Sequence, residues 1–102
     1  MATGTLNTKQ VKVTQNLAIG RIPMDAGETQ GTATFTYANP EGYKRIIVGL
    51  HIGYTESANY ATVRNISYTI DETAMEIKVV INRDSGGQIN PTIYVTAIDV
   101  PV

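Results

Sequence analysis

Hydrophobic and polar side chains alternate most clearly over residues 43–54, YKRIIVGLHIGY. At a period of two, one face is apolar and comprises Ile46, Val48, Leu50, Ile52 and Tyr54. The opposite face comprises Arg45, Ile47, Gly49, His51 and Gly53. A helix would hold both glycines in its interior, at a cost of about 1 kcal/mol each relative to alanine. The pattern therefore predicts a strand whose apolar face packs against a second layer of the fold.

Similar alternation predicts five further strands, at residues 10–19, 29–38, 61–70, 74–82 and 92–100. The first of these loses its alternation near Asn16, which indicates a bulge. Inward side chains are expected at Ile66, Tyr68, Ile70, Met75, Ile77, Val79 and Ile81. The strand at 29–38 has a threonine-rich face, which we expect to meet solvent or another subunit.

The predicted connections are short and rich in turn residues. Residues 39–42, Asn-Pro-Glu-Gly, predict a tight turn because proline fixes φ and glycine permits positive φ. Residues 20–27 and 83–91 contain proline and glycine without periodicity, as loops do. Six strands joined by such loops, without a helical segment, predict an all-β, six-stranded antiparallel β-sandwich.

Composition supports this fold class. Of the 102 residues, 35 are Val, Ile or Thr, whose branched side chains suit a pleated sheet. The length fits a single β-sandwich domain, which we place at residues 9–102. Residues 1–8 are small and polar, and we expect them to form a flexible arm or to contact a neighbouring subunit.

Cysteine content and net charge exclude several kinds of site and binding partner. The chain has no cysteine, which excludes disulfides and thiolate metal sites. A net charge of −1 with scattered basic residues provides no attraction for nucleic acid or acidic membranes. No stretch has the length and apolarity of a membrane span, and residues 1–20 lack the apolar core of a signal peptide. We expect a protein that stays or assembles in the cytoplasm.

Catalytic side chains are sparse. His51 is the only histidine, so it cannot join a second one in a catalytic pair or metal cluster, and it is interpreted as a packed or surface residue. Asp71, Glu72 and Asp84 fall in predicted turns, where aspartate commonly caps its own backbone. Nothing in the sequence fixes a separation between these carboxylates. We therefore expect no enzyme activity, no cofactor and no metal.

The six tyrosines, without any tryptophan, offer a different kind of site. Tyr43, Tyr54 and Tyr60 fall at strand ends or in loops, where their rings could stack on the apolar side of a sugar. The alternative is that they cap the core or lie in a subunit interface. Both interpretations stay open at this point.

The order of these features from Ala33 to Val100 resembles the H-type lectin domain. That domain is a six-stranded antiparallel sandwich known from snail agglutinins and from bacteriophage tail and fibre proteins. The matching features are the Phe35-Thr-Tyr-Ala-Asn-Pro40 element, the central Ile46-Ile-Val-Gly-Leu50, Glu56 and Asn59 in the next loop, the turn at 71–73, and the closing Val95-Thr-Ala-Ile98. The sugar-binding positions of the animal members correspond here to Thr29, Ala61, Asn82 and Arg83. Binding of N-acetylgalactosamine in the animal manner is therefore not expected.

The resemblance implies a symmetric homo-oligomer, typically a trimer, and a bacteriophage virion protein of tail or fibre type that is assembled in the host cytoplasm. The outward face of the last strand is unusually apolar, so we expect a subunit interface at Thr92, Tyr94, Thr96 and Ile98. A site for a host-surface saccharide is expected at Tyr54, Glu56, Asn59, Tyr60, Arg83 and Gln88. A trimer would strengthen such weak sites by avidity. The alternative is a structural or capsid-decorating subunit that binds only protein, including other virion proteins.

Overall fold

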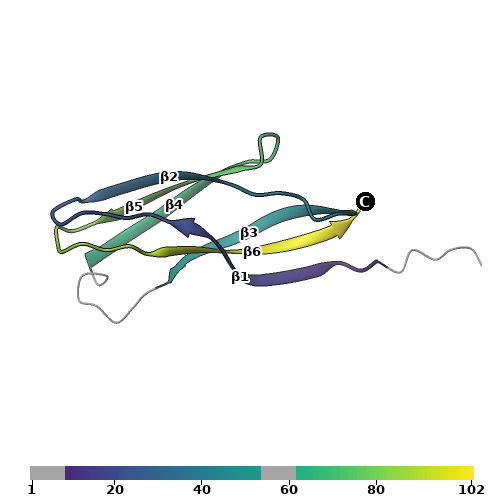
Figure 1. Ribbon diagram of the computed structural model, residues 1–102, viewed down its shortest axis with the longest axis horizontal. Coiled ribbons are helices and arrows are strands. Elements are labelled where there is room, and N and C mark those ends of the chain that lie inside the picture. Colours follow the sequence, from purple (N-terminus) through teal and green to yellow (C-terminus); the bar gives the residue numbers. More distant parts are fainter. Residues whose placement is uncertain (1–8, 54–61) are drawn as a thin grey trace, which may run out of the picture.

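The computed structural model describes residues 9–53 and 62–102 (Figure 1). Its strands are β1 (Lys12–Arg21), β2 (Gln30–Thr36), β3 (Tyr43–Gly53), β4 (Val63–Asp71), β5 (Glu76–Arg83) and β6 (Thr92–Pro101). They form two three-stranded antiparallel sheets, ordered β1-β6-β3 and β2-β5-β4, which make two layers (Figure 1). The expected all-β fold of six antiparallel strands in two sheets is confirmed. Tyr54 and Ala61, at the ends of two predicted strands, lie outside the described residues.

The core lies between the facing sides of the two sheets. Alternate residues of the central strands are fully buried, namely Ile77, Val79 and Ile81 in β5 and Ile93, Val95 and Ala97 in β6. The expected inward orientation of Ile66 and Ile70 in β4 is confirmed, because both pack against this core. Tyr68 pairs with Val79 and so shares the inner side of the sheet, but its side chain is 40% exposed and does not join the core.

Two expectations about local backbone are also confirmed. The register between β1 and β6 shifts between Thr14 and Leu17, and Asn16 has a φ of 57°, which is the expected bulge. In the turn before β3, the backbone N–H of Tyr43 donates to the carbonyl of Pro40 at 2.9 Å, and Gly42 has a φ of 81°. A short polar side chain and a glycine therefore occupy the positions that need positive φ.

Gly20 in β1 lets the two sheets approach closely. A Cβ atom at this position would lie 2.4 Å from Cε1 of Phe35 in β2, and the φ of Gly20 is 155°. The Phe35 ring therefore packs directly against the backbone of β1. Any larger residue at position 20 would push the aromatic ring away from this contact.

A bulge that the alternation did not predict lies in β3. The register passes from the pair of Ile47 with Ala97 to the pair of Gly49 with Thr96, and so skips Val48. Because successive side chains of a strand point to opposite faces, one extra residue reverses the assignment of faces across the bulge.

The bulge corrects the predicted core face of β3. Leu50 and Ile52, on its C-terminal side, face the core as expected. The prediction that Ile46 and Val48 also face the core is wrong, because Ile46 pairs with the outer side of β6 and Val48 is 49% exposed. Ile47 occupies the core instead and is 7% exposed.

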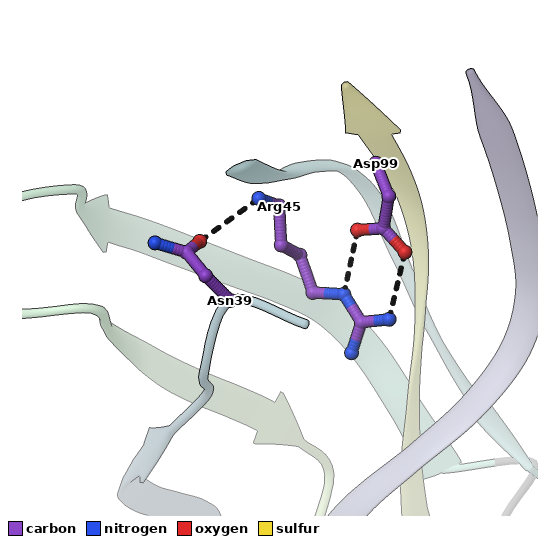
Figure 2. A network of polar contacts seen from close by, with 3 residues as sticks. All are labelled: Asn39, Arg45 and Asp99. Atoms are coloured by element: carbon purple, nitrogen blue, oxygen red, sulfur yellow. Dashed lines mark hydrogen bonds and ion pairs between the residues drawn. The ribbon is translucent and has the colours of Figure 1, made fainter. Parts of the chain in front are cut away.

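The same reversal places a charged side chain on the inner face (Figure 2). Arg45 pairs across the strands with Asp99, and its Nε and Nη2 each donate to a carboxylate oxygen of Asp99 at 2.9 Å. The Asp99 side chain is 4% exposed and that of Arg45 is 17% exposed. The side-chain oxygen of Asn39 accepts from the backbone N–H of Arg45 at 2.9 Å. This bidentate pair closes one end of the core.

Removal of the Asp99 charge should destabilise the protein and change its acid sensitivity. The hydrogen bonds from Arg45 lower the pKa of the Asp99 carboxyl, so the pair stabilises the folded state above the ordinary aspartate pKa near 4. That contribution is lost as the pH falls through the lowered pKa of the folded state. For Asp99→Asn we expect a loss of about 3 kcal/mol at pH 7 and a weaker pH dependence below about pH 4.

Urea unfolding between pH 7 and pH 2 would measure both effects. Asp84→Asn is the matched control, because Asp84 also pairs with an arginine, Arg64, but both side chains are largely exposed. Little change is expected for this control. Equal acid sensitivity of Asp99→Asn and the unsubstituted protein would contradict the role of the buried pair.

Candidate functional site

Arg83 and Gln88, two of the candidate ligand residues, belong to the end of the sandwich where β1 and β5 finish and β6 begins. Two described loops, 22–29 and 84–91, lie together at this end, on the left in Figure 1. Met24 and Ile89 exchange two backbone hydrogen bonds, of 2.8 and 3.0 Å. The N–H of Gly27 also donates to the carbonyl of Gly86 at 2.8 Å. The two loops are therefore joined by their backbones.

The side chain of Arg83 forms hydrogen bonds with both loops. Its Nε donates to the carbonyl of Glu28 at 2.7 Å, its Nη1 to that of Gly87 at 2.6 Å, and its Nη2 to that of Asp25 at 2.9 Å. The residue is only 4% exposed. The planar guanidinium supplies donors in fixed directions, and three of them meet the three loop carbonyls. Arg83 therefore has a structural function in holding the two loops together.

The six expected ligand residues do not meet at one described site. Tyr54, Glu56, Asn59 and Tyr60 lie outside the described residues. Arg83 is buried, and its guanidinium is engaged by the loop carbonyls, so it does not face a surface ligand. Gln88 is exposed on the 84–91 loop.

The sequence contains an indication that the side chain of Arg83 points inward. Arg83 continues the inward alternation of the preceding strand, two residues after Ile81, and this period of two indicates a side chain directed at the core. The alternation does not indicate which groups accept hydrogen bonds from Arg83. The carbonyls of Asp25 and Glu28 are 58 and 55 residues away along the chain.

The expected interface residues share the outer face of β6. Thr92, Tyr94, Thr96 and Ile98 are partly exposed, and they alternate with buried residues.

Val13 of β1 and Ile46 of β3 pair with Ile98 from either side. We call this cluster the aliphatic face. It comprises Val13, Ile46, Val48, Ile98 and Val100. Val13 is 61% exposed and Val48 is 49% exposed.

An aromatic pair lies further along the same outer face. The rings of His51 and Tyr94 are stacked, with their centroids 5.3 Å apart and their planes 17° from parallel. Gly53 provides the space for the tyrosine, since a Cβ atom there would lie 2.5 Å from Cε2 of Tyr94. His51 is thus a surface residue that packs against a neighbouring ring, in agreement with its interpretation from the sequence.

The outer face of the other sheet is polar. The strand registers place twelve residues on this polar face: Gln30, Thr32, Thr34, Thr36, Asn65, Ser67, Thr69, Asp71, Glu76, Lys78, Val80 and Asn82. Val80 is the one aliphatic residue among them. The side chains of Gln30 and Asn82 form a cross-strand hydrogen bond of 3.1 Å. The two outer faces of the sandwich therefore differ sharply in chemistry.

Within the part of the chain that the structure describes, no three His, Cys, Asp or Glu side chains are grouped so as to hold a metal ion. Over the same residues, no helix has the length and apolarity needed to cross a membrane. The chain gives no significant match to a protein-family model, a curated protein or a solved structure. The resemblance to H-type lectins stays a prediction.

Replacement of Arg83 tests its structural role. We expect Arg83→Ala to lower the free energy of unfolding by about 3 kcal/mol, because three loop carbonyls lose a charged donor inside the protein. Gln88→Ala, on the same loop but exposed, should leave stability unchanged. Chemical denaturation of both variants provides the comparison, and equal stability of the two would contradict the assignment.

Proposed function

We propose that this protein is a homo-oligomeric adhesion module of a bacteriophage virion, of tail or fibre type, that presents weak saccharide sites. The contrast between the aliphatic face and the polar face is the observation that carries the proposal. A sandwich with one apolar outer face can bury that face against copies of itself and display the other. The virion assignment rests on the resemblance to H-type lectins.

Self-association is supported by the chemistry of the aliphatic face. A sheet that faces water usually alternates buried apolar residues with exposed polar ones. Here exposed or partly exposed aliphatic side chains from all three strands of one sheet lie side by side around Ile98. Contiguous patches of this kind mark interaction sites. The expected trimer would bring three such faces together around an axis.

Saccharide binding is supported by what association leaves exposed. The polar face and the loop end stay accessible when the opposite sheet is buried. Hydroxyl, amide and charged groups on these surfaces suit a hydroxyl-rich ligand. A single shallow site binds weakly, but three sites on one trimer gain affinity when several sugars are displayed together.

The second candidate function is a structural or capsid-decorating subunit that binds only protein. The organisation of the loop end favours it. Loops 22–29 and 84–91 bind each other through their backbones, and Arg83 spends its donors on their carbonyls. The Arg83 donors bonded to these carbonyls do not reach a saccharide, and this favours a building block over a receptor-binding site.

Oligomer formation can be tested through the aliphatic face. Multi-angle light scattering at micromolar concentration should give a mass close to that of three 11.0 kDa chains. Val48→Glu should produce a folded monomer, because the carboxylate would have to be buried in the interface. Thr32→Glu, on the polar face, should remain oligomeric. A monomeric unsubstituted protein would refute the proposal.

Adhesion can be tested with the labelled oligomer on an array of bacterial polysaccharides and animal glycans. We expect saturable binding to one class, competed by the free sugar and weakened by the double substitution Tyr54→Ala and Tyr60→Ala. Circular dichroism would verify that the variant is folded. If a folded oligomer binds nothing on the array, the result would favour the structural subunit.

A further inference from the structure

The polar face contains an open hollow of about 400 Å³. Five side chains from all three strands line it, namely Thr34, Thr69, Asp71, Glu76 and Lys78. Its volume falls in the range of small-molecule sites, which is about 300–1,000 Å³. It lies on the opposite side of the sandwich from the aliphatic face, so association through that face would leave it accessible.

Strand pairing explains why these side chains meet. Thr34, Lys78 and Thr69 form one row across β2, β5 and β4. Glu76 begins the next row, where it pairs with Asp71. Residues two apart on one strand share a face, so both rows point outward from the same sheet. The hollow is therefore built from regular, paired backbone rather than from loops.

The rim of the hollow at Asp71 is held by the following turn. One carboxylate oxygen of Asp71 accepts from the backbone N–H groups of Thr73 and Ala74, at 3.0 Å each. The backbone N–H of Tyr37, just beyond β2, donates to the carbonyl of Met75 at 3.0 Å and ties this turn to the neighbouring strand. The carboxylate therefore has a fixed orientation.

The charges inside the hollow are available to a ligand. Among the described residues, Lys78 forms no ion pair with Glu76 or Asp71, although all three line the same space. An ammonium group donates hydrogen bonds, carboxylates accept them, and the two threonine hydroxyls do both. The threonine methyl groups and the methylene stem of Lys78 add small apolar surfaces between these polar groups.

We propose that this hollow is a binding site for a saccharide unit, with Glu76 accepting hydrogen bonds from sugar hydroxyls and Lys78 donating to sugar oxygens. Alternating donors and acceptors around small apolar surfaces match the alternating hydroxyl and C–H groups of a sugar ring. This assignment rests on the proposed adhesion function, and it adds a site on the β2-β5-β4 sheet to the one expected in the loops. Because the hollow is open, each site binds weakly and depends on avidity.

The experiment is an amide chemical-shift titration of the oligomer with four monosaccharides: galactose, mannose, N-acetylglucosamine and rhamnose. The same samples are measured for polysaccharide binding on the array. Lys78→Met retains the stem but removes the charge, and Glu76→Gln retains the shape. Each should weaken binding about tenfold, as expected for one charge-assisted hydrogen bond. Thr32→Val is the matched control, since Thr32 shares strand and face with Thr34 but is not part of the lining.

Saturable shifts at Thr34, Thr69 and Lys78 that both variants reduce and the control retains would support the site. Polysaccharide binding that both variants reduce would support it as well. Shifts confined to loops 22–29 and 84–91, or saccharide binding that neither variant changes, would overturn the site while leaving the adhesion function intact. Absence of both shifts and array binding would overturn the site and the adhesion function together.

Discussion

Burial of the facing sides of β5 and β6 is the interaction on which the two-layer structure depends. Each central strand has a neighbour on both sides, and its inner row is fully buried over three consecutive inward positions. A buried valine or isoleucine contributes about 1.5–3 kcal/mol, so these two rows supply much of the driving force for the sandwich.

Each row ends in a charged residue, Arg83 at the loop end and Asp99 at the other. Both are satisfied within the chain, by loop carbonyls and by Arg45 respectively. The two buried charges of the described residues therefore both have partners, and they close the apolar core at its two ends.

The two outer faces of the sandwich differ in chemistry. Aliphatic side chains gather around Ile98 on one sheet, whereas hydroxyl, amide and charged groups cover the other. An assembly that buries the first surface must present the second, so oligomer formation and ligand display follow from the same asymmetry. The loop end contributes rigidity, because its backbones are paired and fixed by Arg83. The polar hollow belongs to the rigid sheet, and it differs in this respect from a site made of loops.

Small irregularities decide how these faces are composed. The bulge at Val48 moves Ile46 and Val48 outward and brings Arg45 and Ile47 inward. Without it, the aliphatic face would lose two of its members, and Asp99 would lack its partner in the core. Gly53 similarly permits the stacking of Tyr94 with His51. One inserted residue and one missing side chain thus shape both the core and the outer surface of the same sheet.

The sequence by itself determined the six strands, the two-layer class and the outward row of the last strand, because alternation with a period of two is a local property. It also placed the bulge near Asn16, where the alternation visibly fails. Only the tertiary structure decided the order of strands, the bulge in β3, the partners of Arg83 and the convergence of side chains in the hollow. These features depend on register between strands that are distant in the chain. Register is selected by the summed burial and hydrogen bonding of whole strands, which no single stretch of sequence contains.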